Sequence, residues 1–588
     1  MSRVTLDALA GRWTPHALAA ELEKLLAGAA RTFTPQQSAA LDRDERFPAG
    51  ICRSLDALGL PRWFVPEAHG GALRDSEDLA QLIRVLSRRD FTVALAHVKT
   101  YLGAVSVWVA GSDRQAAALA ARVSAGEVVS LALTEHEHGS DLLAGDLSAT
   151  PLASGGWRLD GEKWLINNAT RAGMVCVLAR TNPTGGARGF SLLLVDKAAL
   201  TPGSWRALPA VPTHGVRGAD ISGIAFTGAR VAADALIGAE GEGLETILKG
   251  FQITRTLCSA MSLGMTDHAL RLAMRFAGTH RLYGRPLAEL PQAARTLAES
   301  YVDMLAMEAV SLVGVRSIHA LPAEQSVASA VVKYLVPSLG DGVIDGLRGV
   351  LGARAMLVDD HEEGAFQKLD RDHRIVGIFD GSTAVNLNLL VNQFPALVRG
   401  YRAGHTDEPG LAAAVTFDGP PPPLQPQRLA LYSRSGSSVV QSLPAAVAGI
   451  QELAGRHDIP DALADRCARL RNVADSVHAE LSTVRPSPRG VTEETFVLAR
   501  RYAVLYAAAA STHLFLAGFA ARAADPLWQR GAWLDAVLAR LLRRLTGEPD
   551  LDDEDGPAVD ALLPVLRAQH DGGQLFSMFP CELAKEEP

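Results

Sequence analysis

The apolar residues of this chain change their spacing twice, and this double change limits the possible folds more than any other feature. Up to about residue 128 they recur every three or four positions, as in helices. From about 129 to 236 they form short β-type runs between Gly, Asn and Asp turns, which predicts an antiparallel sheet in a small barrel. Helical spacing then returns. A block of strands between blocks of helices excludes a doubly wound parallel sheet.

This pattern predicts an α+β protein of several domains, because 588 residues exceed what one core usually holds. The string FDGPPPPLQPQ cannot form a regular helix or a central strand, so it marks a linker. The predicted parts are an N-terminal helical domain (1–128), a middle β domain (129–236), a helical bundle (237–405), a Pro-rich linker (406–427) and an additional helical domain (428–588).

The composition indicates an ordinary globular protein. Hydrophobic residues make up 48% of the chain and charged residues 21%. A net charge of −8 and a pI of about 6.1 offer no basic surface to nucleic acid. The cysteines are far apart and form no CxxC or Cys/His cluster, which favours a reducing compartment and argues against a structural metal or a disulfide framework. They are Cys52, Cys176, Cys258, Cys467 and Cys581.

One stretch, Tyr502–Ala521, has about the length of a membrane span. It is rich in alanine and carries Ser511, Thr512 and His513 near its middle, so a buried helix of an all-α domain is the favoured interpretation. The N-terminal residues lack the basic and then apolar layout of a signal peptide. We therefore expect a cytoplasmic protein, with membrane association as the less favoured alternative.

Motifs for nucleotide, zinc and serine-hydrolase chemistry are missing. No GxGxxG follows a strand, and GxxxxGK[ST], GxSxG, HExxH and zinc-ligand spacings do not occur. The Gly-rich tracts THGVRGAD and GAEGEGL are loops by composition. These patterns alone describe only a large protein of enzyme size.

Three segments carry a more specific signal. The first is LTEHEHGSD, from Leu133 to Asp141, followed by DGEKWLINNATRAGMVCVLART. The second is RLYGRPLAELPQAARTLAESYVDML and the third is FQKLDRDHRIVGIFDGSTAVNLNLLV. In order and spacing they resemble the TEPxxGSD and GxKxWITN strands, the RxxFGxPLxxxQ helix and the RDARIxxIYEGTxxIQ stretch of the acyl-CoA dehydrogenases. FPAGICRSLDALGL and VPEAHGG also match, and the resemblance runs from about 45 to 397.

The resemblance implies an FAD enzyme that oxidises an acyl thioester, carried on CoA or on an acyl carrier protein, to its 2,3-enoyl product. The implied fold has an N-terminal helical domain, a middle antiparallel β-barrel domain and a helical bundle. The residues beyond 428 resemble the helical tail of the larger members in placement only. A homodimer or dimer of dimers, and an electron-transfer flavoprotein as electron acceptor, are also implied.

Asp380 is the predicted catalytic base. The family buries its base and polarises the thioester carbonyl, while flavin N5 takes the β-hydrogen as hydride. Most members use the Glu of IYEGT, and Asp380 of IFDGS stands at that position. An Asp before Gly is ordinarily a turn residue, but within this motif a base is favoured. One branch of the family places its Glu in an ERxxxA helix; here Thr254 precedes Arg255, which excludes that arrangement.

The resemblance also implies the residues that contact the cofactor and the substrate. The implied FAD contacts are Leu131, Leu133, Thr134, Ser140, Leu165, Asn167, His280, Arg281, Arg348, Gly352 and Ser382. The implied substrate contacts are Ser140, Gln252, Arg255 and Gly381. No metal ligand is implied.

Several positions depart from the family pattern. His136 replaces the Pro of TEPxxGSD, and Leu165 and Asn167 replace an aromatic residue and a Thr near the flavin. His280 aligns with an Arg that reaches the FAD diphosphate of the neighbouring subunit. Arg348 replaces a Gln, and we expect its charge to offset the one lost at His280.

Two other functions stay open. Asp380 is one methylene shorter than Glu, so its oxygen would lie about 1 Å further from the acyl chain. The family's nitroalkane oxidases also use Asp here, which keeps a flavin oxidase of a small carbon acid as an alternative. The other alternative is a catalytically impaired flavoprotein that acts as a binding subunit.

Four arginines of the additional helical domain could suit a membrane surface or an acidic carrier protein, but solvated helix faces are the favoured interpretation. They are Arg500, Arg501, Arg543 and Arg544.

Overall fold

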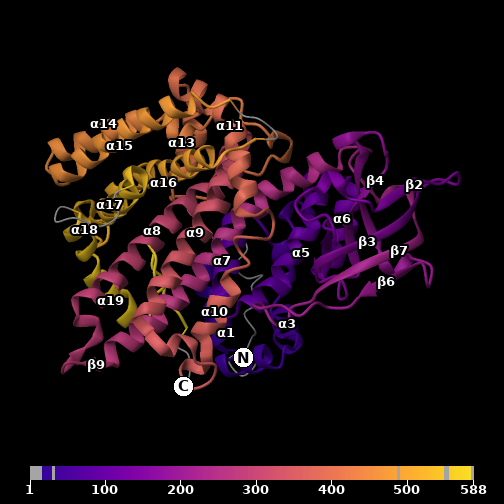
Figure 1. Cartoon of the computed structure of the whole chain (residues 1–588), viewed down its shortest axis with the longest axis horizontal. Helices are drawn as coiled ribbons and strands as arrows, with labels where there is room; N and C mark the ends of the chain where they lie inside the picture. Colours follow the sequence, from indigo (N-terminus) through magenta and orange to yellow (C-terminus); the bar gives the residue numbers. More distant parts are fainter. Residues whose placement is uncertain (1–15, 29–32, 486–489, 548–554, 585–588) are drawn as a thin grey trace. The chain divides into compact units, whose positions relative to one another are not determined.

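The computed structural model describes residues 16–28, 33–485, 490–547 and 555–584, so the start of the predicted N-terminal helical domain lies outside the described residues. The chain divides into two compact units, and the helices and strands of each are drawn in Figure 1. The first unit is Met1–Gly11, Gly28–Leu79 and Asp90–Thr254, and the second is Arg12–Ala27, Ala80–Arg89 and Arg255–Pro588.

Helices form the N-terminal part of the first unit, as predicted. They are α2 (Pro35–Arg43), α3 (Ala49–Ala57), α5 (Phe91–Ala110) and α6 (Asp113–Ser124), and α4 (Ser76–Arg89) passes from this unit into the other. The side chain of Asp90 accepts a hydrogen bond from the Val93 amide and so begins α5. Ser112 and Gln115 form a capping box at the start of α6.

The β region of the first unit is one sheet. Its strands are β1 (Val129–Ala132), β2 (Ser148–Pro151), β3 (Trp157–Asn167), β4 (Met174–Arg180), β5 (Phe190–Asp196), β6 (Trp205–Leu208), β7 (Ile221–Val231) and β8 (Leu236–Ile237). The strand order is β6-β7-β3-β2-β4-β5-β8, with β1 paired to β4. Side chains from β3, β4, β5 and β7 build its hydrophobic core.

The sheet is mixed, which corrects the expectation of a purely antiparallel domain. β1 runs parallel to β4, with Val129 opposite Met174, and β2 also meets β4 in parallel at Ser148 and Arg180. The long connection that contains β2 and β3 lies between β1 and β4, and a crossover of this length allows the chain to return in the same direction. Within the described residues the pairings form an open path with β6 and β8 at its ends.

The second unit is helical apart from one hairpin in its described part. Its long helices are α7 (Gly243–Thr279), from Arg255 on, α8 (Pro291–Ala320) and α9 (Gln325–Leu351). The shorter ones are α1 (Ala17–Gly28), which lies mostly in this unit, α10 (Ala365–His373), α11 (Thr383–Ala403) and α12 (Glu408–Val415). The segment predicted as a helix at 281 starts as a hairpin, β9 (Arg281–Leu282) with β10 (Arg285–Pro286), because Tyr283 and Gly284 both have positive φ.

The region beyond residue 428 adds seven helices in its described part. They are α13 (Ser438–Gln441), α14 (Leu443–Gly455), α15 (Asp461–Leu481), α16 (Glu493–Arg522), α17 (Ala532–Thr546), α18 (Gly556–Asp560) and α19 (Leu563–Asp571). Their buried side chains join those of α7, α8, α9 and α11 in one continuous hydrophobic core. The additional helices therefore complete the core of the bundle and do not build one of their own.

The predicted linker is partly helical, which corrects the expectation for residues 406–427. The side chain of Asp407 accepts a hydrogen bond from the Gly410 amide and begins α12. Ala414 and Phe417 are buried in the core. Pro426–Arg428 forms a 3-10 turn. The proline string itself forms no regular helix, as predicted. The residues before it do form one, because they include good helix formers, begin with a capping residue and bury one face.

The last described residues are fixed by carboxylates deep in the bundle. Glu308 of α8, 1% exposed, accepts hydrogen bonds from the Ser577 hydroxyl and the Met578 amide, each over 2.6 Å. Asp267 of α7 accepts one from the Phe576 amide over 2.9 Å. These buried carboxylates are satisfied by a segment about 270 and 310 residues further along the chain.

Three helical segments are long and apolar enough, by length and composition, to cross a membrane: Phe91–Ala110, Pro322–Met356 and Glu493–Arg522. In each of them, most of the most apolar stretch of 18 residues is buried inside the protein: 83%, 78% and 78%, in the same order. The last segment contains the stretch Tyr502–Ala521, and Ser511 and Thr512 at its middle are fully buried and hydrogen-bonded to carbonyls of their own helix. These helices pack inside the protein.

Candidate active site

Asp380 lies in the turn between α10 and α11, where two consecutive residues have a left-handed backbone. The φ angle is +54° at Asp380 and +102° at Gly381. The φ of +102° strongly favours glycine at position 381, and a Cβ atom there would also lie 2.9 Å from Nη2 of Arg255. Ser382 follows as the cap of α11, its Oγ accepting a hydrogen bond from the Val385 amide. The string DGS thus forms a tight turn with one defined backbone path.

Arg255, predicted to bind substrate, holds this turn. Its Nε donates a hydrogen bond to the carbonyl oxygen of Asp380 over 2.7 Å. Burial lowers the pKa of the Arg255 guanidinium to about 10, while the negative charge of Asp380 opposes that change. One turn further along α7, Sγ of Cys258 lies 3.8 Å from Oδ2 of Asp380. α7 therefore contacts both the backbone and the carboxylate of Asp380. Gln252 is buried on the same helix.

Two buried side chains that the sequence did not single out hold the other side of the turn. Nζ of Lys333, on α9, donates to the carbonyl oxygens of Val376 and Gly381 over 2.6 and 3.2 Å. Nδ2 of Asn386, on α11, donates to the carbonyls of Gly381 and Ser382, each over 2.9 Å. Lys333 stands inside the apolar string SAVVKYLV, and a charge in such a run is the signal that could have identified it.

The predicted flavin contacts of the first unit gather on β1, β3 and the loop after β1. Thr134 and Trp164 are linked by two hydrogen bonds, from Oγ1 of Thr134 to the Trp164 carbonyl (2.7 Å) and from the Trp164 amide to the Thr134 carbonyl (2.9 Å). Leu131 lies in β1 and Leu133 directly follows the strand. Oδ1 of Asn167 is buried and lacks a hydrogen-bond partner among the described residues. Such an oxygen can accept a hydrogen bond from a ligand.

Leu165 and Ser140 are both exposed in this unit. Leu165 has a φ of +57° at a register shift between β3 and β7, and it is 45% exposed. A bulge of this kind redirects a side chain and is common beside active sites. Ser140 lies in a bend of the loop after Thr134. The sequence could not reveal the bulge, because it depends on pairing with a strand more than 50 residues away.

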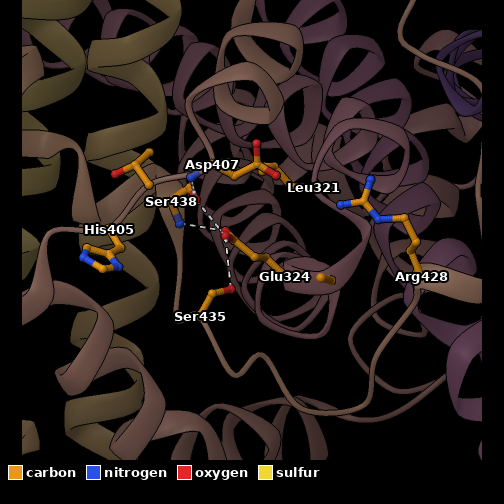
Figure 2. Close-up of a pocket in the computed structure, with 9 residues that line it drawn as sticks. Leu321, Glu324, His405, Asp407, Arg428, Ser435 and Ser438 are labelled. Atoms are coloured by element: carbon orange, nitrogen blue, oxygen red, sulfur yellow. Dashed lines mark hydrogen bonds between the residues drawn. The ribbon is translucent and has the colours of Figure 1, made fainter.

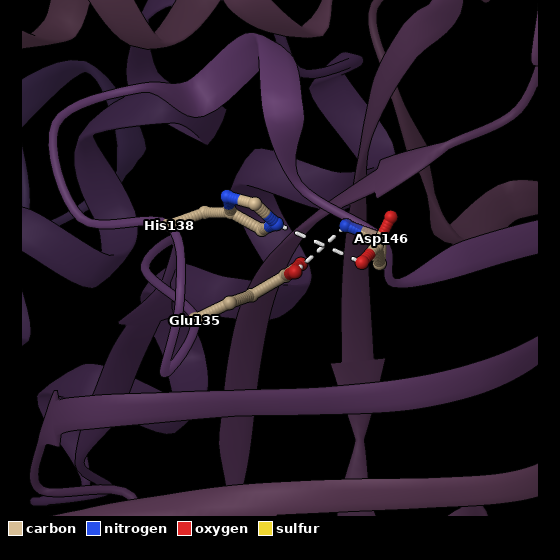
Figure 3. Close-up of side chains that lie close together, drawn as sticks. All are labelled: Glu135, His138 and Asp146. Atoms are coloured by element: carbon tan, nitrogen blue, oxygen red, sulfur yellow. Dashed lines mark hydrogen bonds and ion pairs between the residues drawn. The ribbon is translucent and has the colours of Figure 1, made fainter.

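Glu135, His138 and Asp146 lie together beside this loop (Figure 3). The amides of Asp146 and Leu147 donate to the Glu135 carboxylate over 2.7 and 3.0 Å, and Nζ of Lys163 donates to it over 2.7 Å. Burial alone would raise the pKa of Glu135, but these bonds outweigh it and lower that pKa. Because both oxygens already accept hydrogen bonds, we assign Glu135 to fixing the loop and not to binding a metal.

Arg348 is engaged by carboxylates of its own chain. Its Nη1 pairs with Asp345, and its Nη2 donates to Asp370 over 3.0 Å. These partners compensate its charge, so little remains to offset the charge lost at His280. Gly352 ends α9 with a φ of +59°. Whether these residues approach a diphosphate stays a prediction of the resemblance.

The other two residues predicted near the diphosphate lie at the hairpin. His280 stacks on Phe276, with ring centroids 4.7 Å apart and an angle of 18° between the planes. Arg281 is exposed and donates to the Gly284 carbonyl over 2.9 Å. Tyr283, at the hairpin tip, is 87% exposed. This end of the second unit presents cationic and aromatic side chains to its surroundings.

A cavity of about 290 Å³ lies elsewhere in the second unit (Figure 2). The buried Glu324 accepts hydrogen bonds from the amide and the hydroxyl of Ser438, over 2.6 and 2.7 Å. Burial raises the pKa of this carboxyl group, and the Ser438 hydrogen bonds oppose the rise. None of the predicted site residues contributes to its lining, which consists of Leu321, Ala323, Glu324, His405, Thr406, Asp407, Arg428, Ser435 and Ser438.

Three family models match consecutive parts of the chain. The acyl-CoA dehydrogenase N-terminal domain matches residues 20–127, the middle domain matches 130–229 and the C-terminal domain matches 241–394. Together they cover more than half of the chain. The Asp380 turn lies in the third match and the Thr134 loop in the second.

Individual proteins show the same similarity. The chain is 31% identical to (2S)-methylsuccinyl-CoA dehydrogenase of Cereibacter sphaeroides over 277 residues, and this match spans about half of that relative (49%) and 45% of the chain. It is 26% identical to the human mitochondrial short-chain specific acyl-CoA dehydrogenase over 65% of the chain and 92% of that protein. The fold also matches the structure of an acyl-CoA dehydrogenase complexed with FAD from Bacillus anthracis. This match includes 99% of the present chain and 96% of the Bacillus chain, with a TM-score of 0.70 and 18% sequence identity.

Proposed function

Because the chain belongs to the acyl-CoA dehydrogenase family, we propose that it oxidises an acyl thioester to the 2,3-enoyl product with FAD as its cofactor. It is then an oxidoreductase acting on CH–CH groups. The acyl group would be carried on CoA or on an acyl carrier protein. The observation that supports this function best is the turn that holds Asp380 in one backbone conformation, at the position of the family's base.

The residues of the first unit suit the flavin. The buried Oδ1 of Asn167 has room for a donor, and Leu165 offers an exposed apolar side chain two residues before it. Thr134 is fixed against β3 by its two hydrogen bonds with Trp164. When bound, FAD supplies the acceptor for the β-hydrogen, which leaves as hydride.

The chain itself supplies the base and the frame around it. Asp380 would take the α-proton on its carboxylate, and its backbone amide would donate a hydrogen bond to the thioester carbonyl. Arg255 fixes the carbonyl of the same residue, so the amide and the side chain keep one direction. Preorganised donors of this kind contribute most to catalysis when they need no rearrangement during the reaction.

The absorption spectrum of the purified protein tests the function. A bound flavin should give a yellow protein, and a matching acyl thioester should bleach it under nitrogen. Bleaching that is seen only without oxygen identifies a dehydrogenase. Turnover in air with peroxide formation, above all on a nitroalkane, would establish the oxidase that Asp380 also permits. A colourless protein, or a yellow one that no thioester reduces, would leave the binding subunit as the remaining function.

Asp380→Asn tests the base. The two side chains are nearly isosteric, so flavin content and ligand affinity should stay within about twofold. The rate of flavin reduction should fall by roughly 100- to 10,000-fold, because an amide cannot accept the proton. Reduction as fast as in the unmodified enzyme would make Asp380 a turn residue only.

The assembly and the location are further parts of the proposal. We propose a homodimer or a dimer of dimers, with His280 and Arg281 directed to the FAD of the neighbouring copy. The exposed hairpin tip supports this proposal. An electron-transfer flavoprotein is the proposed acceptor and the cytoplasm the proposed location. Arg543 and Arg544 pair with Asp555 and Asp303 inside the second unit, which argues against their use at a membrane surface.

A further inference from the structure

Lys333 is buried where an apolar residue would be expected. It lies in the first third of α9, is 1% exposed, and is flanked by Val331, Val332 and Leu335, which are also buried. Removal of an ammonium group from water is unfavourable unless the group receives strong hydrogen-bond partners. A Met or Leu would fill a similar volume without that penalty, so the position of Lys333 calls for a role beyond packing.

The hydrogen bonds of Lys333 indicate that role. Its Nζ donates to the carbonyl oxygens of Val376 (2.6 Å) and Gly381 (3.2 Å), which lie four residues before Asp380 and directly after it. The ammonium also lies 5.5 Å from the centre of the Phe379 ring. One side chain thus joins the two ends of the segment that carries the carboxylate.

Arg255 acts on the same segment from another helix. Its Nε donates to the carbonyl of Asp380, between the two carbonyls that Lys333 holds. The segment after α10 is a series of turns, in which the amides of Ile378 and Phe379 donate to the Ile375 carbonyl, and the positive φ angles of Asp380 and Gly381 end it. Two buried cations therefore satisfy three carbonyls in and beside this turn, and they do so from α7 and α9.

We propose that Lys333 is a positioning residue for the acyl-CoA dehydrogenase reaction. The hydrogen bonds of its ammonium group hold both ends of the Asp380 turn, and so fix the direction of the Asp380 carboxylate. The inference rests on the proposed function for the identity of the base. The effect of Lys333 on the rigidity of the turn can be measured by hydrogen exchange, without any substrate.

Lys333→Met tests the proposal by removing the donors while keeping the side-chain length. Backbone hydrogen exchange in residues 376–383 should become at least about tenfold faster, because the turn opens locally once its ends are released. The rate of flavin reduction should fall on the order of 100-fold, the effect of a displacement of about 1 Å at the reacting groups. KM should change by less than about threefold, because the substrate contacts remain. Lys333→Arg keeps a cation with several donors and should restore most of the protection and rate.

Lys368→Met is the matched control. Lys368 lies on α10, next to the turn, and pairs with the carboxylate of Asp372 over 2.7 Å. The Lys368→Met variant should have a lower thermal stability, but its backbone hydrogen exchange in residues 376–383 should be no faster than in the wild type. If Lys333→Met yields no folded protein, Lys333→Gln replaces it, and its exchange and rate are compared with those of Lys333→Arg.

Exchange in 376–383 that stays at the wild-type rate in the neutral Lys333 variant overturns the proposal. So does faster exchange that is equal in the Lys368 variant, because the effect would then be general loosening. Wild-type protein that no thioester reduces overturns the function proposed above, while the exchange comparison still decides whether Lys333 holds the turn.

Discussion

Asp380 adopts a backbone conformation that few residues other than glycine tolerate. Its φ of +54° is in the left-handed region, where Asp and Asn are several-fold enriched over longer side chains. The hydrogen bond from Arg255 goes to the backbone carbonyl of residue 380, so it does not depend on the side chain at that position. The residue type therefore determines mainly how far the carboxylate reaches.

Asp380→Glu tests that reach. The added methylene should move the carboxylate about 1 Å towards the substrate, and we expect flavin reduction by straight-chain acyl-CoA to become on the order of tenfold faster. Stopped-flow measurement of flavin bleaching gives the rate. A slower reaction would show that the pocket is built around Asp, because the longer side chain then overshoots.

His513 should make folding sensitive to mild acid. It is buried in α16, with Nε2 2.9 Å from the Ser442 hydroxyl and 3.1 Å from the Val439 carbonyl, and burial lowers its pKa to about 4. Between about pH 6.5 and 4 the unfolded chain binds a proton here that the folded chain does not. The free energy of unfolding should therefore decrease as the pH falls, by about 2 kcal/mol at pH 5 for this residue.

His513→Gln keeps a donor but removes the titration. The decrease in melting temperature between pH 7.5 and pH 5 should be smaller in this variant than in the wild type. His405→Gln, at an exposed position, should leave the decrease unchanged. Equal decreases in all three proteins would show that His513 does not titrate differently in the folded chain.

At the scale of elements, the buried carboxylate of Asp303 on α8 binds two arginines of α17, one of which also pairs with Glu299. Asp303 receives two hydrogen bonds from Arg540, each 2.7 Å, and two from Arg544, at 3.0 and 2.8 Å. Burial alone would raise the pKa of Asp303, but the two guanidinium groups hold it well below the usual range. This carboxylate is a point of attachment between the bundle and the additional helices.

Asp303→Asn should destabilise the protein by roughly 3–5 kcal/mol, because it removes the carboxylate that both guanidinium groups share and leaves Arg540 with Glu299 alone. Asp560→Asn is the control, because Asp560 lies at the end of α18 and pairs with a residue of the same helix α8. It removes the more exposed ion pair with Arg295 and should change stability by less than about 1 kcal/mol. Urea unfolding followed by circular dichroism measures both, and equal effects would contradict the attachment.

The sequence predicted the long elements well and the short ones poorly. The β-type runs VVSLALT, GWRLDGEKWLI, MVCVLART, FSLLLVDK and ISGIAFTG correspond to β1, β3, β4, β5 and β7, whereas β2 (SATP), β6 (WRAL) and β8 (LI) contain no apolar run of that kind. The direction of β1 relative to β4 depends on the path of the chain between them, which periodicity does not contain. α12 was hidden because the proline string beside it dominated the composition.

The same distinction applies to the site. Asp380, Gly381 and Ser382 could be found because one motif contains them. Lys333 lies almost 50 residues before that motif, and only the folding of α9 against the turn brings it there. The partners of Arg348 were equally invisible, because Asp370 comes from another helix. A single sequence shows residues that function together locally, and misses those that tertiary packing assembles.

At the scale of the whole molecule, the exposed hairpin tip should lie in an interface between copies. Tyr283 is 87% exposed and Leu282 41%, and a protein rarely leaves such side chains in water at a protruding tip. Tyr283→Asp should weaken dimerisation at least about tenfold, because a charge would replace a central aromatic contact. It should also reduce flavin retention if two subunits complete each FAD site.

Sedimentation velocity at several protein concentrations measures this change. Tyr432→Asp introduces the same charge at another exposed tyrosine and should leave the sedimentation coefficient unaffected. An FAD-loaded monomer in the wild type would contradict the proposed assembly directly.

The hydrogen bonds from Ser577 and Met578 to Glu308 have a consequence for biosynthesis. Glu308 leaves the ribosome long before its partners, and at about 5–20 residues per second the interval is roughly 15 to 50 seconds. During this time Glu308 has Arg84, made earlier, as a partner but lacks the hydrogen bonds from Ser577 and Met578. Folding of the second unit can thus finish only after residues 577 and 578 have left the ribosome, and until then the chain is an expected client of chaperones that shield apolar surface.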